Sequence, residues 1–303
     1  MIKKLEELLL RVKNLKRVTL AVAAAEDEEV LQAVFNAREE GIIEPILVGD
    51  LEKIKTISES LGKSLDGIEL IFGENLEDSA KKAVTLVAEK KADFIMKGLL
   101  DTSILLKAVL NKDAGLRTDS LLSHVMAYEI PTYDRLLIMT DGGMNIAPSK
   151  EEKVKILKNA IEASKAFELD EIKVACLAAK EKPSDKMPAT VDVRYLQELS
   201  EEGEFGKNVM VEGPLAFDLA VSKEAANIKG FKSKVTGEVD IMLVPTIEVG
   251  NGIGKALTYM AGAKSAGVIM GAKVPVVLVS RADDHETKLY SIALGAMIAQ
   301  KNK

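Results

Sequence analysis

Apolar and polar positions follow two different periods along the chain. Short runs rich in β-branched residues, typical of strands, are followed by segments in which apolar residues recur every three or four positions, typical of helices. Over the first hundred residues this cycle predicts strands at 17–23, 45–48, 69–72 and 93–96, and helices at 27–40, 51–61 and 76–90. Strands that alternate with helices pair in parallel and carry helices on both faces of their sheet. The pattern therefore predicts an α/β fold with mostly parallel sheets.

The alternation of predicted strands and helices is interrupted near residue 121. Two runs, 121–128 and 135–139, are separated by only a few residues around Pro131, which predicts an antiparallel pair. A turn-rich segment follows, and Ser149 with Glu152 three residues later marks the start of a long helix. Later strands are expected at 172–178, 239–245, 265–269 and 274–280, and a last helix at 284–300. At roughly 150 residues per domain, we predict two α/β domains, 1–140 plus 284–303 and 141–283.

The composition and the net charge exclude several classes of function. Hydrophobic residues make up 47% of the 303 residues and charged residues 29%, which indicates a folded chain with a sizeable core. A net charge of −6, the absence of Trp and an aromatic content of 4% argue against a polynucleotide as partner. The chain contains no run of about 18 uncharged apolar residues, and its first residues are typical of an amphipathic helix rather than a signal peptide. We expect a cytoplasmic protein with no membrane partner.

Four segments place polar residues and glycines directly after an apolar run, where ligands bind in parallel sheets. The first contains Lys97 and Gly98, with Thr102 and Lys107 just beyond. A lysine, a glycine and a helix start suit an anion bound at a helix N-terminus. The alternative is a plain strand-to-helix turn with lysines that face solvent.

The second segment runs from Asp141 through two glycines to Asn145, directly after the apolar run 136–139. The polar residues that are concentrated in this short segment favour a binding site. The alternative is a tight glycine turn that the Asp and Asn side chains cap.

The third segment, 250–255, contains Asn251 and Lys255 among three glycines. It is not a GxxxxGK phosphate loop, because Val249 stands where a glycine is needed, and it is not a GxGxxG turn, because Lys255 stands at the third glycine. Binding of a phosphate-type anion and a bare glycine turn both stay open.

The fourth segment is the strongest functional signal. Ser280 and Arg281 end an apolar strand, and Asp283, Asp284 and His285 follow directly. The alternative is a serine N-cap followed by an acidic first turn of a helix.

Several enzyme classes lack their residues in this sequence. There is no GxSxG motif, and Cys176 lies inside an apolar strand, where an inert core thiol is expected. His124 and His285 are too far apart for an HExxH zinc helix. We therefore expect neither a metal site nor acyl-enzyme chemistry at a serine or cysteine with a histidine base.

Taken in order, these segments resemble the phosphate acetyltransferase/phosphate butyryltransferase family over nearly the whole chain. The resemblance rests on Lys97-Gly98 with Thr102, Asp141 to Asn145 with Pro148, Gly213-Pro214-Leu215 with Asp218, Asp240 to Pro245, Gly250-Asn251 with Lys255, and Pro275 to Arg281. Residues 105–125 and 280–291 resemble the butyryl branch more than the acetyl branch. The resemblance implies two αβα domains with a cleft between them, as in the isocitrate and isopropylmalate dehydrogenases, in a homodimer or larger homo-oligomer.

The resemblance also implies a reaction. An enzyme of this family moves the acyl group of butyryl-CoA, or of a branched short-chain acyl-CoA, to inorganic phosphate, giving an acyl phosphate and coenzyme A. Phosphate is the nucleophile, so the site must position two anions and stabilise an oxyanion. No metal and no cofactor are implied, and a butyrate kinase is a metabolic partner.

Roles for single residues follow from the same resemblance. Ser280 would donate to the oxyanion and Arg281 would bind phosphate through its guanidinium fork. The base for the coenzyme A thiol would be Asp283, Asp284 or Glu286. The substrate-binding residues would be Lys97, Thr102, Lys107, Asp141, Asn145, Asn251 and Lys255. The sequence departs from the acetyl enzymes at Thr287, where they have an aspartate, and at Tyr259, where they have an arginine.

Three other interpretations stay open. A phosphate acetyltransferase would share all of these features. A metal- and nicotinamide-dependent dehydrogenase of the same architecture would need a cluster of metal-binding aspartates, which the sequence does not show. A non-enzymatic ligand-binding protein is disfavoured by Ser280 and Arg281 beside acidic residues.

Overall fold

The computed structural model describes residues 1–280 and 283–301, which form two compact units. The central unit consists of Leu121–Ser265 with Met1–Lys4, and the terminal unit consists of Leu5–Ser120 with the described part of Ala266–Lys303. No helix among the described residues is long and apolar enough to cross a membrane.

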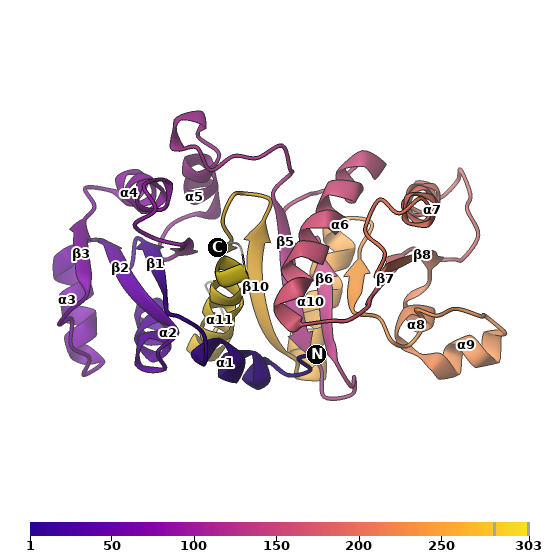
Figure 1. Ribbon diagram of the computed structural model, residues 1–303, viewed down its shortest axis with the longest axis horizontal. Coiled ribbons are helices and arrows are strands. Elements are labelled where there is room, and N and C mark those ends of the chain that lie inside the picture. Colours follow the sequence, from indigo (N-terminus) through magenta and orange to yellow (C-terminus); the bar gives the residue numbers. More distant parts are fainter. Residues whose placement is uncertain (281–282, 302–303) are drawn as a thin grey trace. The chain divides into compact units, whose positions relative to one another are not determined.

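The terminal unit alternates helices with strands (Figure 1). Its strands lie in the order β3-β2-β1-β4-β11-β10, and neighbours are parallel except β10 and β11. Its elements, including a 3-10 turn, are α1 (Leu5–Lys13), β1 (Val18–Ala23), α2 (Glu28–Glu39), β2 (Ile43–Gly49), α3 (Leu51–Ser60), β3 (Glu69–Phe72), α4 (Leu76–Ala88), β4 (Phe94–Lys97), α5 (Thr102–Val109), η1 (Lys112–Ala114), β10 (Lys264–Met270), β11 (Val276–Val277) and α11 (His285–Lys301).

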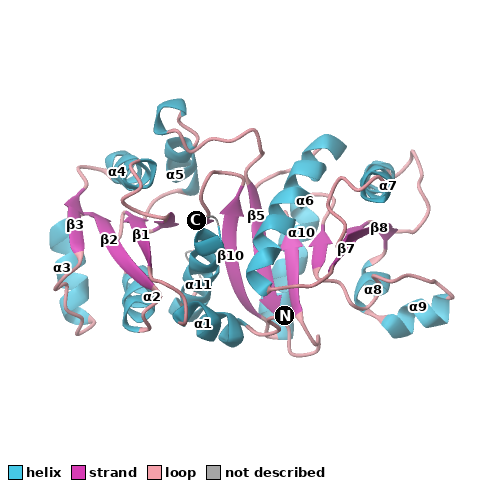
Figure 2. Ribbon diagram, viewed as in Figure 1, coloured by secondary structure: helices cyan, strands magenta, loops and turns pink. Residues whose placement is uncertain are grey.

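Local signals account for these elements. Asp27, Asp50 and Asn75 each accept a hydrogen bond from a backbone N–H of the helix that they precede, which fixes where α2, α3 and α4 begin. Strands β1 and β4 are buried along almost their whole length because helices flank the strands of this unit (Figure 2). The strands and helices predicted between residues 17 and 97 are confirmed within a few residues at each end.

The central unit has the strand order β5-β6-β9-β7-β8. Strands β5 and β6 are antiparallel, as predicted, and the other neighbours are parallel. The predicted capping box of Ser149 and Glu152 starts α6. The elements of this unit are β5 (Ser123–Glu129), β6 (Leu136–Thr140), α6 (Lys150–Ser164), η2 (Lys165–Phe167), β7 (Ile172–Leu177), α7 (Pro188–Glu201), β8 (Val209–Leu215), α8 (Phe217–Val221), α9 (Lys223–Lys229), β9 (Ile241–Leu243) and α10 (Ile247–Ala261).

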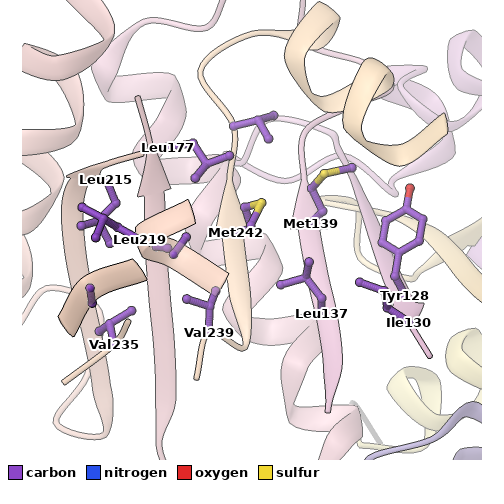
Figure 3. Packing of buried hydrophobic residues seen from close by; sticks show 14 of the residues in the cluster. Tyr128, Ile130, Leu137, Met139, Leu177, Leu215, Leu219, Val235, Val239 and Met242 are labelled. Carbon is purple, nitrogen blue, oxygen red and sulfur yellow. The ribbon is translucent and has the colours of Figure 1, made fainter. Parts of the chain in front are cut away.

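One face of the central sheet carries a buried apolar cluster (Figure 3). All strands of this unit contribute to it, as does the short helix α8. Labelled members in Figure 3 include Tyr128, Leu137, Met139, Leu177, Leu215, Leu219 and Met242. This packing holds the carboxyl ends of β6 and β9 in fixed positions, and the loops that follow them carry candidate site residues.

The boundaries of the units differ from the predicted domains at three places, the first of which is Met1–Lys4 in the central unit. Residues 121–140 belong to the central unit, because β5 pairs with β6 and β6 pairs with β9. Residues 266–283 belong with the terminal unit where they are described, because β11 pairs with β4. The turn-rich segment after residue 140 is therefore a connection inside one unit. Strand β8 was not predicted from the sequence, and β11 is shorter than the predicted strand 274–280.

Candidate functional site

Three neighbouring parallel strands of the terminal unit, β1, β4 and β11, bring candidate residues together. Asp27 follows β1, Lys97 ends β4 and Ser280 follows β11. Because the carboxyl ends of parallel strands meet at one edge of a sheet, these side chains converge although they are distant in sequence. They line one small pocket with Val30, Gly98, Leu99, Val279 and Lys288. Its volume is about 20 Å³, which is room for one water-sized atom.

Lys97 points into the protein. Its side chain is buried, and its Nζ donates hydrogen bonds to the carbonyl oxygens of Gly98 at 3.3 Å and Leu100 at 3.0 Å. A Cβ on Gly98 would lie 2.0 Å from the carbonyl oxygen of Ala24, so this close approach of two backbones requires glycine. For Lys97, the alternative of a solvent-facing lysine in a plain turn is therefore wrong.

The two residues beyond Gly98 have different surroundings. Thr102 is the first residue of α5 and is partly buried. Lys107 is exposed and lines a separate hollow of about 540 Å³ between α4 and α5, beside Lys81 and Ile104. The structure thus does not bring Lys107 into the pocket that Lys97 and Ser280 line.

The turn after β11 is organised by its own carboxylates. The backbone N–H of Ser280 donates to Oδ2 of Asp283 at 2.8 Å, and the N–H of Thr287 donates to Oδ1 of Asp284 at 2.8 Å. This second contact lowers the pKa of Asp284 below its usual value, because a hydrogen bond to the carboxylate favours the charged form. Both acids therefore shape the turn and the start of α11. Arg281 lies outside the described residues.

Lys288 is a site residue that the sequence analysis did not assign. It sits in the first turns of α11, is only 3% exposed, and its Nζ donates to the carbonyl oxygen of Asp283. It lines the same pocket as Lys97 and Ser280. The sequence gives one indication of its burial, because the other residues of this helix are largely apolar. That indication is weak, because the burial of α11 depends on contacts with other elements.

In the central unit, Asp141 organises the turn after β6. Its buried carboxylate accepts hydrogen bonds from the backbone N–H groups of Gly143 and Met144, each at 2.9 Å. It also accepts from the side-chain amide of Asn145 at 2.6 Å, and that amide donates to the carbonyl oxygen of Leu122 at 2.9 Å. The capping alternative is thus confirmed for Asp141, and Asn145 ties the turn to the chain before β5.

The third predicted segment is not a loop. Residues 250–255 lie inside α10, so the bare glycine turn is wrong as a local structure, whereas binding of a phosphate-type anion by this segment stays a prediction. A Cβ on Gly250 would lie 2.6 Å from Cα of Gly142, which shows that α10 packs directly on the Asp141 turn. Asn251 and Lys255 are exposed on α10, next to this contact. The second and third segments therefore form one constellation.

Three further residues of the central unit bear on its chemistry. His124 lies against the turn, because a Cβ on Gly143 would come within 2.6 Å of its Nδ1. Tyr259, where acetyl enzymes have an arginine, is exposed, and the Nζ of Lys255 lies 5.6 Å from the centre of its ring. The thiol of Cys176 is buried inside β7, and this burial raises its pKa to about 12. Cys176 is thus an inert core residue, as predicted.

Among the residues that the structure describes, no group of three or more His, Cys, Asp or Glu side chains is placed to hold a metal ion.

The candidate site residues fall into two sets. Asp27, Lys97, Ser280 and Lys288 lie together in the terminal unit, and Asp141, Asn145, Asn251 and Lys255 lie together in the central unit. Each set combines fixed backbone turns with cationic or amide groups, which suits the binding of anionic substrates.

Known proteins of similar sequence and structure match nearly the whole chain. A family model described as phosphate acetyl/butaryl transferase matches residues 71–296. A phosphate butyryltransferase of Clostridium acetobutylicum is 44% identical over 299 residues, with 99% of each chain covered. A probable phosphate butyryltransferase of Bacillus subtilis is 46% identical over 298 residues, with 98% of this chain and 99% of the relative covered. The solved structure of a branched-chain phosphotransacylase from Enterococcus faecalis is similar with a TM-score of 0.81 at 32% identity, over 93% of this chain and 99% of that one.

Proposed function

Because the chain belongs to the phosphate acetyl/butaryl transferase family, we propose that it transfers a four- or five-carbon acyl group from coenzyme A to phosphate. It is an acyltransferase whose substrates are a short-chain acyl-CoA and phosphate. The observation that carries the choice of acyl group is the identity of 44% and 46%, over almost the full length, with the two butyryltransferase relatives.

The proposed reaction is a direct displacement at the thioester carbonyl. A phosphate oxygen attacks the carbonyl carbon, a carbon–oxygen bond forms, and the carbon–sulfur bond breaks to release coenzyme A as the thiolate, which then takes up a proton. No protein nucleophile is needed, which agrees with the burial of Cys176. Ser280 is exposed three residues after β11, and we propose that its hydroxyl donates to the developing oxyanion.

The contacts of the two acids after Ser280 bear on the choice of base. Asp284 caps α11, and the hydrogen bond that lowers its pKa makes it a weaker proton acceptor. Asp283 accepts the Ser280 N–H through Oδ2, so its carboxylate lies directly beside Ser280. We therefore favour Asp283 over Asp284 as the base for the coenzyme A thiol. Asp283→Asn should lower the rate of acyl-CoA synthesis from acyl phosphate more than Asp284→Asn does.

The preference for chain length is limited by what an apolar pocket can contribute. Butyryl exceeds acetyl by two methylenes, each worth roughly 0.8 kcal/mol when buried. The total of about 1.6 kcal/mol corresponds to roughly a 15-fold preference, since tenfold is about 1.4 kcal/mol. A shorter acyl group still fits the pocket and is not strongly rejected. We therefore expect butyryl and branched four- or five-carbon groups to react best, propionyl less well, and acetyl poorly but measurably.

Values of kcat/KM for acetyl-, propionyl-, butyryl- and isovaleryl-CoA test this proposal. A maximum at four or five carbons supports it. A maximum at acetyl would show that the protein is a phosphate acetyltransferase, the other activity in the family description, and would leave the rest of the mechanism in place.

We also propose that the reaction needs no metal and no cofactor. The chemistry is displacement at an activated ester, and lysine, serine and backbone groups supply the positive potential that two anionic substrates need. Activity should be unchanged after extensive dialysis against a chelator. Loss of activity that added divalent cation restores would contradict this part of the proposal.

A homo-oligomer is proposed from the surface of α10. Three apolar side chains of this helix are exposed, Val249 at 38%, Tyr259 at 67% and Met260 at 86%. Large apolar side chains grouped on one helix mark an interaction surface, and we propose that a second copy of this chain covers them. Light scattering should give a mass of at least twice 32.7 kDa. Met260→Lys should reduce this mass, and a monomeric wild-type protein would refute the proposal.

We also propose that the protein acts in the cytoplasm and that a butyrate kinase consumes the acyl phosphate that it forms.

A further inference from the structure

A basic hollow lies on the terminal unit beside the turn that joins β10 to β11. Its volume is about 610 Å³, and it is lined by Lys112, Gly115, Arg117, Thr118, Asp119 and Lys273. The lining carries three cations and one acid, a net charge of 3 − 1 = +2. The whole chain, by contrast, has a net charge of −6. The hollow is thus a local excess of positive charge on an acidic protein.

The fold does not neutralise the three cations of the basic hollow. Lys112, Arg117 and Lys273 are exposed, and among the described residues no carboxylate forms an ion pair with any of them. Residues 281–282 and 302–303, which the structure does not describe, contain no Asp or Glu. The positive charge of these side chains therefore faces solvent and any anion that enters the hollow.

Backbone contacts hold two distant segments together around the basic hollow. The backbone N–H of Lys273 donates to the carbonyl oxygen of Leu116 at 3.0 Å, and the hydroxyl of Thr118 donates to the carbonyl oxygen of Gly271. Leu116 is buried, and Gly115 before it has a φ of +69°, a left-handed conformation that glycine adopts readily. The cations therefore project from a fixed backbone, which lowers the entropic cost of binding a ligand.

The lining of the basic hollow favours a compact anion of high charge. It contains no large apolar side chain, so an acyl chain or a nucleobase would gain little by burial there. Lysine and arginine bind phosphate oxygens through charge-assisted hydrogen bonds. The volume falls within the roughly 300–1,000 Å³ of small-molecule sites and exceeds what a single phosphate fills. Two linked phosphate groups fit both the charge and the volume.

We propose that the basic hollow binds a diphosphate group, as in inorganic pyrophosphate or a nucleoside diphosphate, at a site separate from the reaction site. Lys273 precedes β11 and Ser280 follows it, so the strand separates the two residues. Among the described residues, the basic hollow and the pocket at Ser280 have no lining residue in common. The proposal therefore stands or falls independently of the proposed function.

Isothermal titration calorimetry with inorganic pyrophosphate, in the presence of a chelator, tests the site directly. Lys273→Met and Arg117→Met each remove one cation and keep a side chain of similar length. Lys55→Met is the matched control, because Lys55 is an exposed lysine of α3 outside the basic hollow. We expect each hollow variant to weaken pyrophosphate at least about tenfold, since each loses a charge-assisted hydrogen bond. Lys273→Arg and the control should stay within about threefold of wild type.

Two further titrations identify the source of the diphosphate group. ADP carries this group on a nucleoside, and AMP carries a single phosphate. We expect pyrophosphate to bind more tightly than ADP, because the lining offers a nucleoside no apolar contact. Tighter binding of ADP would assign the same site to a nucleotide. Binding of AMP as tight as that of ADP would refute recognition of two phosphate groups.

Two results with the variants would overturn the proposal. One is an affinity for pyrophosphate in Lys273→Met and Arg117→Met that stays within about twofold of the Lys55→Met control. The other is a rise of about tenfold in the KM for butyryl-CoA in the same two variants. That rise would assign the hollow to the diphosphate of the substrate rather than to a separate ligand. The KM for butyryl-CoA should instead stay within about twofold of wild type.

The salt dependence of binding to the wild-type protein is a test that needs no variant. The screening length falls from about 10 Å at 0.1 M salt to about 3 Å at 1 M salt. Because the three cations are exposed, the affinity for pyrophosphate should fall at least about tenfold over this range. An affinity that does not change with salt would refute binding by these side chains, even if a hollow variant fails to fold.

Discussion

Replacement of Gly250 by alanine tests how closely α10 packs on the Asp141 turn. The added Cβ would lie 2.6 Å from Cα of Gly142 and 2.8 Å from Cγ2 of Val244, whereas ordinary contacts begin at 3.4 Å. The first contact is thus short by 3.4 − 2.6 = 0.8 Å, and the atom that it meets belongs to backbone, which no rotamer change can move away. The helix must therefore shift away from the turn.

The expected magnitude follows from two opposing terms. Overpacking of this kind costs about 1–3 kcal/mol, and a backbone obstacle favours the upper part of that range. Alanine in a helix interior gains about 1 kcal/mol over glycine. We expect Gly250→Ala to lower the free energy of unfolding by about 1–2 kcal/mol.

Gly252→Ala is the matched control in the same helix. A Cβ there would meet nothing within 4 Å, so only the gain in helix propensity applies. This variant should be unchanged or more stable by up to about 1 kcal/mol. Urea unfolding of both variants at equal protein concentration, followed by circular dichroism, measures the difference. If Gly250→Ala is as stable as Gly252→Ala, the direct contact between α10 and the turn is refuted.

Three further predictions concern single side chains. Ser280→Ala should lower kcat on the order of 100-fold, the usual cost of a lost oxyanion donor, without a change in melting temperature, and a near-normal kcat would remove Ser280 from the mechanism. Cys176, with a pKa of about 12, should react with a thiol reagent at mildly alkaline pH only after unfolding; mass spectrometry that finds rapid labelling of the native protein would contradict its burial. Glu238 pairs with Lys173 and Lys223, which lower its pKa from 4.5 to about 2, so its contribution to stability is full above pH 4.5 and is lost as the pH falls toward 2. The difference in melting temperature between wild type and Glu238→Gln should shrink across that range, and a constant difference would speak against the pairing.

Most of the terminal unit was predictable because its signals are local. Continuous apolar runs mark strands that are covered on both faces, and Asp27, Asp50 and Asn75 mark where helices begin. Strand β8 was missed because Gly213 and Pro214 interrupt its apolar pattern. A strand at the end of the sheet order tolerates these residues, since one of its sides needs no ladder partner.

The candidate site was predictable only in part, because its geometry depends on contacts between distant segments. The glycines of 250–255 have the local pattern of a turn, yet they lie in a helix, and Gly250 is needed because Gly142 touches it. The burial of Lys288 likewise depends on how α11 packs, which no short pattern encodes. The resemblance found Ser280 and Lys97, and the pairing of β11 with β4 explains why they meet.

The release of free thiol from butyryl-CoA, measured with and without inorganic phosphate in the presence of a chelator, tests the central claim most directly. We expect release only when phosphate is present, with one acyl phosphate formed for each thiol. Release of thiol at the same rate without phosphate would mean thioester hydrolysis and would contradict transfer of the acyl group to phosphate.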